Sequence, residues 1–291
     1  MASRQQIKRR ITSVKNTKQI TRAMQMVAAS KLRKAQEAAV GPREYARLAR
    51  ELLTHLRSLK EGNHAKGAAL YAERKVKNRL LVLITSDRGL AGAYNSNVIR
   101  RGINELIEDD KNGVNTKVLA IGRQAANAAA RLKGTEVIAA YTGLPDRPDA
   151  NYLRPILTTM VDTFLDEEVD AVDIIFTNFV SSIRQDVNVQ RLLPAGFETE
   201  EVSADVASAT IEPSVDELLQ AATMRLLDAQ LYQVMLESRA SEYSMRMIAM
   251  KNATDNASEL VEDLTLEFNT ARQAAITQEL AEISGGAEAM K

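Results

Sequence analysis

The chain contains no Cys and no Trp, and it has only seven Tyr and five Phe among its 291 residues. Without Cys it can form neither a disulfide, nor a thiolate metal site, nor a cysteine nucleophile, and thiol regulation is excluded. Long apolar runs are also missing, because residues 80–84 and 174–180 are far shorter than the roughly 20 residues that a membrane-spanning helix needs. We therefore expect one or two ordinary domains and no direct span of a lipid bilayer.

Gly and Pro are scarce, with 13 Gly and 6 Pro, and neither occurs in residues 1–40 or 214–284. Because both residues interrupt helices, these gaps predict long uninterrupted helices at the two ends of the chain. Ser-x-x-Glu and Ser-x-x-Gln capping patterns mark the helix starts at Ser214 and at Ser3. Gly285 and Gly286 supply a stop signal for the second helix, and the sequence leaves open whether it ends at Ser284 or continues to Lys291.

Apolar residues in the first segment repeat at helical spacings of three and four. The positions are Ile7, Ile11, Val14, Ile20, Met24, Val27, Ala28, Leu32, Ala35 and Ala39. The register shifts after Val14 and resumes from Ile20, and the pattern continues beyond Gly41-Pro42 as far as Leu59. The last segment has a similar stripe, which includes Leu260 and Leu264. Both are typical of a coiled coil with slips in its register.

The two ends carry opposite charge within a chain whose net charge is zero. Residues 1–60 hold 15 basic and 3 acidic side chains, whereas residues 213–291 hold 6 basic and 13 acidic ones. A basic first segment can be a transit peptide or a nucleic-acid patch, but it has no cleavage-type ending and no aromatic residue before Tyr45 for stacking on bases. We therefore expect the two terminal helices to pair antiparallel with each other, and no nucleic acid.

Between the terminal helices, short β-rich runs alternate with helical ones. Strands are predicted at residues 79–85, 117–121, 136–140 and 172–180, and helices at 97–111, 124–132 and 154–169. This alternation predicts parallel βαβ units and a small Rossmann-like α/β domain, so the whole chain is a mixed α+β and α/β protein. The expected division is a first coiled-coil helix at 1–60, a linker at 61–74, the α/β domain at 75–200, a linker at 201–213 and a second coiled-coil helix at 214–291.

The loop after the first strand lies where phosphate-binding loops occur, but its spacing differs from theirs. Gly89-x-x-Gly92 is neither G-x-G-x-x-G nor a P-loop with its Lys-Ser/Thr pair. A structural turn, with Asp87 and Arg88 capping or pairing locally, is the favoured interpretation, and a phosphate site is the alternative. We expect no cofactor.

Groups that could perform catalysis are equally scarce. The two His residues, His55 and His64, have no carboxylates at metal-ligand spacing. No G-x-S-x-G or H-E-x-x-H motif occurs. The sequence therefore indicates a non-enzymatic chain without a metal site.

The stretch Ile276 to Ala289, ITQELAEISGGAEA, fits every specified position of I-T-x-E-x-x-[DE]-x-x-x-G-A-x-A. This pattern resembles the gamma subunit of F-type, proton-translocating ATP synthases. Residues 11–34, 85–95 and 247–257 are similar to the same family, so the resemblance covers both terminal helices and the middle domain.

The resemblance implies a rotor. In the family, the terminal helices form the central shaft inside a hexamer of three alpha and three beta subunits. The α/β domain lies beside the epsilon subunit and the membrane proteolipid c-ring. The chain would then couple ion-driven rotation of that ring to ATP synthesis or hydrolysis at the beta subunits, as a non-catalytic subunit on the cytoplasmic face of the bacterial inner membrane. A mature organellar origin stays open.

The resemblance also implies contact residues. Those expected to touch the alpha/beta hexamer are Arg22, Met24, Gln25, Arg272, Gln273, Thr277 and Glu279. Ile211 and Glu212 match a segment near the proteolipid ring. For the four residues between 272 and 279 the alternative is ordinary exposed helix polarity, and for Met24 it is packing in the coiled coil. We also expect a shaft surface of small and polar residues, because large apolar side chains would lock it in its sleeve. The alternative function is a non-rotary coiled-coil tether or scaffold with an α/β head.

Overall fold

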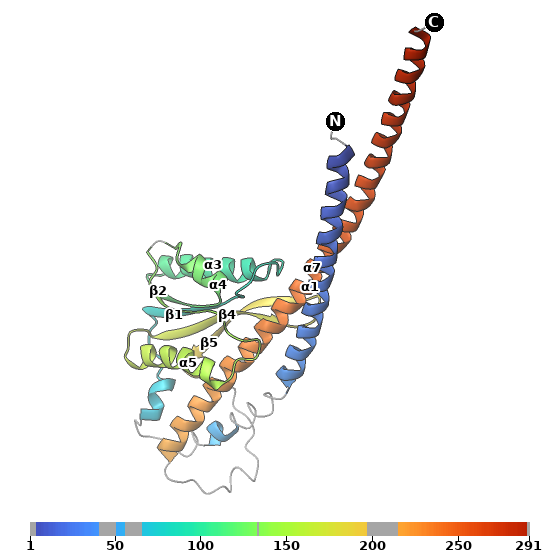
Figure 1. Ribbon diagram of the computed structural model, residues 1–291. Helices are drawn as coiled ribbons and strands as arrows, with labels where there is room; N and C mark the ends of the chain where they lie inside the picture. Colours follow the sequence, from blue (N-terminus) through green and yellow to red (C-terminus); the bar gives the residue numbers. More distant parts are fainter. Residues whose placement is uncertain (1–3, 41–50, 56–65, 133, 197–214, 290–291) are drawn as a thin grey trace. The chain divides into compact units, whose positions relative to one another are not determined.

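The computed structural model describes residues 4–40, 51–55, 66–132, 134–196 and 215–289 (Figure 1). The chain divides into two compact units. Unit 1 combines residues 1–29 with residues 246–291, and unit 2 comprises residues 30–245.

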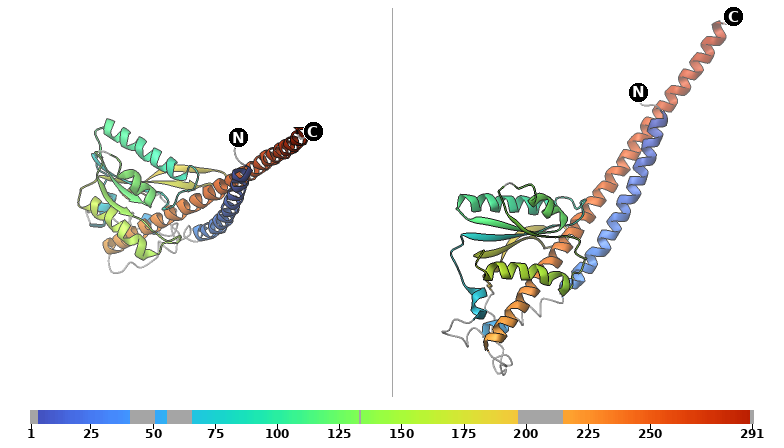
Figure 2. Two further views of the ribbon diagram at one scale, coloured as in Figure 1. Left: turned by 45° about the horizontal axis from the view of Figure 1, so that its top comes forward. Right: turned by 60° about the vertical axis from the view of Figure 1, so that its left-hand side comes forward.

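Unit 1 consists of parts of the two long helices, α1 (Arg4–Val40) and α7 (Val215–Ala289). The two helices run side by side in opposite directions, with the two chain ends at the same end of the unit (Figures 1 and 2). Within this unit, α7 reaches further than the first residues of α1. The predicted antiparallel coiled coil of the two chain ends is confirmed.

Gly285 and Gly286 do not stop the second helix, because α7 continues through them to Ala289. Of the two ends that the sequence left open, the structure therefore excludes the one at Ser284. A Gly inside a helix costs only about 1 kcal/mol relative to Ala, and Ala287 and Ala289 favour the helical state. The predicted caps at Ser3 and Ser214 lie outside the described residues.

The buried face of α1 follows one heptad register without a slip. The positions of this register follow one another at spacings of four and three, and all are buried or half-buried: Ile7, Ile11, Val14, Lys18, Thr21, Gln25, Ala28, Leu32 and Ala35. The predicted shift to Ile20 and Val27 is wrong, since these side chains are 60% and 56% exposed. The register passes through Thr21 instead, whose hydroxyl is hydrogen-bonded to that of Thr254 on α7 at 2.8 Å. A polar residue is tolerated at this buried position because its hydroxyl has a partner.

The facing stripe of α7 has the same spacing. Its positions are Met250, Thr254, Ala257, Val261, Leu264, Phe268, Ala271 and Ala275. Leu260 was expected in this stripe but is 41% exposed. Its neighbour Val261 takes the inward position, as the heptad from Thr254 requires.

Unit 2 contains a five-stranded sheet in the order β3-β2-β1-β4-β5. Its strands are β1 (Asn78–Ile84), β2 (Asn115–Ile121), β3 (Val137–Tyr141), β4 (Ala171–Phe179) and β5 (Gln185–Leu193). The first four are parallel, and β5 pairs antiparallel with β4. The predicted Rossmann-like parallel sheet is confirmed for those four strands.

Helices cover both faces of this sheet (Figure 1). One layer holds α3 (Tyr94–Lys111) and α4 (Arg123–Ala129), which pack on a small apolar core. The other holds α5 (Ala150–Leu165) and part of α7, which shares a larger core with the sheet. Helix α7 contributes Leu227, Leu231, Val234 and Met235 to that core, so it is a structural part of the α/β domain.

Strand β5 is the one strand of this sheet that the sequence did not predict. Its run Gln185 to Arg191 is mostly polar, because it forms an edge of the sheet. Only Val187 and Val189 point into the core beside α3.

Residues 51–55 are helical, as the predicted helix over residues 1–60 requires. Leu53 packs in a cluster with Leu219 and Leu226 of α7. The predicted linker 61–74 contains a short 3-10 helix, η1 (Lys66–Tyr71).

Candidate functional site

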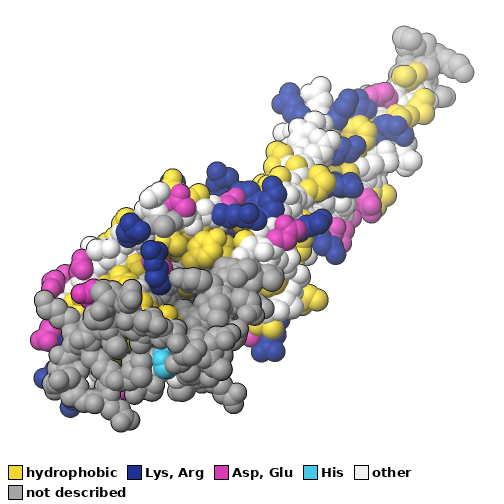
Figure 3. All heavy atoms as spheres, turned by 90° about the horizontal axis from the view of Figure 1, so that it is seen from below, with side chains coloured by type: hydrophobic (Ala, Val, Ile, Leu, Met, Phe, Trp, Pro, Cys, Tyr) yellow, Lys and Arg dark blue, Asp and Glu magenta, His cyan; other side chains and the backbone are white. Residues whose placement is uncertain are grey.

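The candidate site is the outward surface of the two-helix unit. Basic and apolar side chains interleave along the helices (Figure 3). On α1, Ile20, Met26 and Val27 are 56–61% exposed. A cluster of this kind on an outward helix face is typical of a surface that contacts another protein.

The last turns of α7 carry a second apolar stripe. Ile276, Leu280 and Ile283 follow one another at spacings of four and three, which places them on one side of the helix. Their side chains are 46%, 60% and 70% exposed, and Leu266 further back is 71% exposed. Most other exposed residues of α7 in this unit are polar or small, as expected, but these large apolar side chains interrupt that surface.

The predicted hexamer contacts lie on both helices of this unit. Arg22 is exposed on α1, and Met24 and Gln25 are half-buried there. On α7, Arg272, Gln273, Thr277 and Glu279 are exposed. Their spacing places Arg272 and Glu279 two turns apart on one side of the helix. Among the described residues, no hydrogen bond or ion pair joins the α1 group to the α7 group.

One of these polar groups already has a partner within the helix. The Thr277 hydroxyl donates to the carbonyl oxygen of Gln273 at 3.0 Å. Its oxygen still has acceptor capacity toward a partner protein. Ile211 and Glu212, the predicted contacts near the proteolipid ring, lie outside the described residues.

The exposed apolar residues were missed by sequence reasoning, although the pattern held the information. The heptad from Ile7 through Val14 leads to Thr21 and Ala28 when it is continued without a slip. That register leaves Ile20 and Val27 on the outside.

In unit 2, the loop after β1 is a structural turn. The Asp87 carboxylate accepts hydrogen bonds from the backbone N–H of Arg123 at 3.0 Å and of Gly143 at 3.1 Å. These two residues follow β2 and β3, so Asp87 joins the loops after three neighbouring strands. Gly122 completes the turn with φ +93°, and an added Cβ would lie 2.3 Å from the Thr85 carbonyl oxygen. Asp87 therefore has a structural role, as the favoured interpretation expected, but its partners Arg123 and Gly143 lie in the loops after β2 and β3 and not in its own turn.

Helix α7 covers part of the same edge of the sheet. Ligands of doubly wound folds bind at the carboxyl ends of the strands. Here the Ser241 hydroxyl donates to the carbonyl oxygen of Thr177, near the end of β4, at 3.0 Å. The Arg239 guanidinium donates to the carbonyl oxygen of Leu144, after β3, at 3.1 Å. Both side chains of α7 are buried, so the helix occupies space that a nucleotide takes in other folds of this class.

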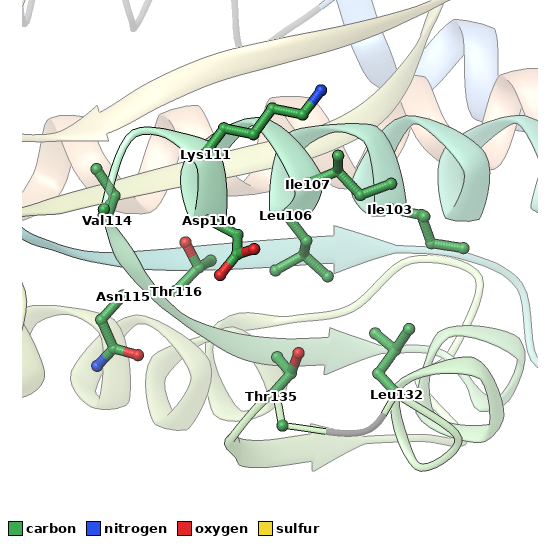
Figure 4. A pocket seen from close by; sticks show the side chains of 12 residues that line it. Ile103, Leu106, Ile107, Asp110, Lys111, Val114, Asn115, Thr116, Leu132 and Thr135 are labelled. Atoms are coloured by element: carbon green, nitrogen blue, oxygen red, sulfur yellow. The ribbon is translucent and has the colours of Figure 1, made fainter.

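A depression of about 640 Å³ lies on the other side of unit 2, between α3 and the turns that flank β2 and β3 (Figure 4). Its lining combines the apolar Ile103, Ile107 and Leu132 with Asp110 and Lys111. These residues form an open surface feature and offer no pair of groups poised for acid–base chemistry.

Two further features of the described part of the chain bear on other functions. No group of three or more His, Cys, Asp or Glu could hold a metal ion there. Within the same residues, no helix has a stretch that is apolar and long enough to cross a membrane.

The chain is similar to solved structures of ATP synthases. A chain of the Tetrahymena thermophila mitochondrial ATP synthase, in a structure described as central stalk and c-ring, has a TM-score of 0.61 and 24% identity over 80% of this chain and 99% of that one. A chain of the Euglena gracilis mitochondrial enzyme, in a structure of OSCP, F1 and c-ring, has a TM-score of 0.68 and 17% identity over 99% of this chain and 94% of that one. At these identities the likeness shows the fold.

Relatives found by sequence have higher identity to this chain than these solved structures have. A family model described as ATP synthase matches residues 3–290. The ATP synthase gamma chain of Roseiflexus castenholzii is 40% identical over 290 residues, which cover 100% of this chain and 99% of the relative. That of Moorella thermoacetica is 40% identical over 291 residues and 100% of both chains. With an antiparallel two-helix unit, a Rossmann-like domain and this full-length similarity, the chain belongs to the ATP synthase gamma-chain family.

Proposed function

We propose that this chain is the rotor shaft in the central stalk of an F-type ATP synthase. The observation that carries the proposal is full-length similarity at 40% identity to ATP synthase gamma chains, together with the two-helix unit and its exposed apolar surface. The chain itself is a non-catalytic coupling subunit of a catalytic complex.

The partners follow from this role. One copy of the chain occupies the centre of three alpha and three beta subunits. The epsilon subunit and the proteolipid c-ring contact its α/β domain, which corresponds to residues 75–200. Ile211 and Glu212 are the proposed contacts near the ring. The chain is a peripheral subunit on the cytoplasmic face of the bacterial inner membrane, in which the ring is embedded.

The hexamer contacts combine the predicted polar residues with the exposed apolar ones. Arg272, Gln273, Thr277 and Glu279 alternate on α7 with the stripe of Ile276, Leu280 and Ile283. An interface of this kind buries apolar area at its centre and exchanges polar contacts with water at its rim.

Asymmetry of the shaft supplies the mechanism. Helices α1 and α7 differ in length and sequence, so a shaft built from them has no threefold symmetry. It presents a different face to each of three beta subunits. A partner shifts a conformational equilibrium only through different contacts with its states. Each catalytic site therefore has its own nucleotide affinity, and rotation exchanges these affinities in order. Reciprocity lets ATP hydrolysis turn the shaft in the opposite direction.

A single-molecule experiment tests this function. The chain has no Cys, and Asn112 is an exposed residue at the end of α3, so Asn112→Cys provides one labelling site. The variant is assembled with immobilised alpha and beta subunits, a bead is attached and ATP is added. We expect rotation in one direction with three main steps per turn, as the threefold arrangement of beta subunits requires. ATP hydrolysis with a bead that only fluctuates would contradict the rotor function.

The alternative function, a coiled-coil tether or scaffold, predicts a different stoichiometry. A shaft must occur once per six surrounding subunits, whereas a tether can self-associate or bind one subunit. The mass of the reconstituted complex separates the two functions.

A further inference from the structure

Three side chains from three separate segments of unit 2 meet at one point. The Lys31 ammonium on α1 lies 2.7 Å from a carboxylate oxygen of Asp146, in the connection between β3 and α5. The Tyr243 hydroxyl on α7 donates a hydrogen bond to the same carboxylate. The ammonium also lies 5.4 Å from the centre of the Tyr243 ring, within the range of a cation–π contact. Each member of this junction triad therefore contacts the other two.

Further hydrogen bonds join the same connection to both helices. The Arg147 guanidinium donates to the backbone carbonyl of Lys34 on α1 at 2.6 Å. The Arg239 guanidinium on α7 donates to the carbonyl of Leu144 at 3.1 Å and pairs with Glu242 at 2.8 Å. Residues 144–147 are thus bonded to α1 at two points and to α7 at two points.

Helix α7 is held to the sheet by polar contacts in this region. The Ser244 hydroxyl donates to the carbonyl oxygen of Ser182, in the turn between β4 and β5, at 2.8 Å. Ser241 makes the equivalent contact with Thr177. Both serines are buried. Hydrogen bonds depend on direction, whereas apolar contacts do not, so polar contacts of this kind resist sliding and twisting of a helix against its support.

The junction triad lies where both long helices leave unit 2. The boundary between the units falls after Ala29 in α1 and after Met245 in α7, two residues from Lys31 and from Tyr243. Both helices continue across this boundary without a break. Lys31 and Tyr243 thus lie within two residues of the boundary, and Ser244 adds a hydrogen bond to Ser182 beside them.

We propose that the junction triad is the torque-bearing joint between the α/β domain and the two helices. The proposal rests on the rotor function. Torque that enters through the α/β domain must reach both helices, and α1 is linked to the sheet along the chain only through residues 41–77. The triad connects α1 to the domain directly, across about a hundred residues of sequence, and joins α7 at the same point. Lys31, Asp146 and Tyr243 are therefore positioning residues, which hold the unit 2 parts of α1 and α7 against the α/β domain.

Single substitutions in the assembled complex test the joint. Lys31→Met removes the charge and keeps most of the stem, and Tyr243→Phe removes only the hydroxyl. Because charge-assisted hydrogen bonds are about twice as strong as neutral ones, we expect roughly a twofold rise in the angular variance of a bead on Asn112→Cys when the helices are held fixed in the hexamer. The ATPase rate of the alpha/beta hexamer should stay unchanged. Lys31→Arg should restore the stiffness.

Matched controls use residues of the same type away from the triad. Arg33→Met removes a cation from an exposed i, i+4 pair with Glu37 on α1. Tyr152→Phe removes the hydroxyl of a half-exposed Tyr on α5. Neither control should change the angular variance. If Lys31→Met and Tyr243→Phe are as stiff as the parent chain, the torque-bearing joint is refuted.

A cross-link provides the converse test. A chain that carries Lys31→Cys and Asp146→Cys is cross-linked between the two Cys by a short bifunctional maleimide. The cross-linked chain should rotate freely and regain the stiffness that the two substitutions remove. Arrest of rotation by the cross-link would show that the joint opens in each cycle, and it would overturn the proposal.

Hydrogen exchange on the isolated full chain separates this inference from the rotor function. Amides of residues 30–38 and 144–149 should exchange faster in Lys31→Met than in Arg33→Met, and unchanged protection would refute the joint even if no rotation is seen. Absence of rotation in the parent chain would count against the rotor function alone. Normal rotation with unaltered stiffness in the variants would count against the joint alone.

Discussion

At the scale of single residues, a buried ion network fixes α3 to the sheet. Arg79 on β1 donates to Asp173 on β4 at 2.6 Å and to Glu105 on α3 at 2.8 Å, and it pairs with Asp109 at 3.0 Å. All four side chains are nearly inaccessible to solvent. Burial alone would lower the pKa of Arg79, but the three carboxylates outweigh it and raise the pKa. The guanidinium is therefore charged at every pH at which the protein is folded.

Removal of the Arg79 guanidinium should strongly destabilise the folded chain. Arg79→Leu leaves three buried carboxylates without their shared partner, and we expect a loss of about 3–5 kcal/mol in the free energy of unfolding. Urea unfolding followed by circular dichroism measures it. The matched control is Arg184→Leu, whose partner Asp186 is exposed, and its expected cost is about 0–1 kcal/mol. Equal losses in the two variants would contradict the role of burial.

At the scale of elements, the contact between α1 and α7 in unit 1 includes a polar pair. Thr21 and Thr254 are both buried, and their hydroxyls bond to each other at 2.8 Å. Each hydroxyl also lies within bonding distance of a carbonyl in its own helix, Lys18 for Thr21 and Met250 for Thr254. The pair fixes which turns of the two helices face each other.

A double-mutant cycle should reveal this pairing. Thr21→Val or Thr254→Val alone leaves one hydroxyl without its cross-helix partner, and the expected cost is about 1 kcal/mol. The double variant replaces both hydroxyls by methyl groups of the same shape, so its stability should be equal to or above that of the parent chain. Thermal unfolding of the four chains gives the coupling energy. Strictly additive losses would show that the hydroxyls do not interact.

The contribution of the junction triad to the stability of the fold depends on pH. Burial by itself raises the pKa of the Asp146 carboxyl, but hydrogen bonds from Lys31 and Tyr243 outweigh it, and nearby Arg239 adds to them. The net effect holds the pKa of Asp146 below its usual value. A carboxyl with a lowered pKa stabilises the folded state above its unfolded pKa of about 3.9, and this contribution is lost as the pH falls through the folded pKa.

The comparison of Asp146→Asn with the parent chain tests the direction of this pH dependence. We expect the parent to have the larger free energy of unfolding at pH 7, and we expect the difference between the two chains to vanish in acid. In a Lys31→Met background the difference at pH 7 should be smaller, because the main stabilising partner is gone. Equilibrium unfolding across this pH range measures both. A difference that grows in acid would contradict the charged triad.

At the scale of the whole molecule, the apolar stripe on the last turns of α7 matters for assembly. Ile276, Leu280 and Ile283 are exposed in the chain alone. If the hexamer surrounds the shaft, these side chains are buried on assembly, and each contributes through the apolar area it loses to the interface.

Leu280→Ser should therefore weaken assembly. Burial of a Leu side chain is worth about 1.5–3 kcal/mol, so we expect roughly a tenfold or greater loss of affinity for the alpha/beta hexamer. Surface-immobilised hexamer and titrated chain give the binding constant. Leu165→Ser, on α5 in unit 2, is the matched control, since its side chain is also exposed but lies outside the two-helix unit. Equal affinity of Leu280→Ser and the parent chain would show that this stripe is not part of the interface.

Much of the architecture could be predicted from local patterns. The absence of Gly and Pro, together with helical spacing, predicted the two long helices. Four of the five strands were predicted to within two residues at each end. Local patterns were weaker where polar residues are buried. Strand β5 is mostly polar because it lies at a sheet edge, and Thr21 is buried because a residue more than two hundred positions away supplies its partner.

The candidate site shows the same division. The family resemblance supplied Arg272, Gln273, Thr277 and Glu279, which are all exposed on α7. The exposed apolar residues of α7 escaped prediction because a stripe of Ile and Leu is equally compatible with a buried seam. Only the presence or absence of a facing helix distinguishes the two.

By itself, the sequence determined the helix–sheet–helix order, the antiparallel pairing of the ends and the family, because helical periodicity, Gly and Pro placement and family motifs are local properties. The tertiary structure alone decided which side of each helix is buried, that α7 covers the carboxyl edge of the sheet, and that Lys31, Asp146 and Tyr243 meet. Those outcomes depend on contacts between residues distant in the chain, whose energies exist only once the folded backbone brings the partners together.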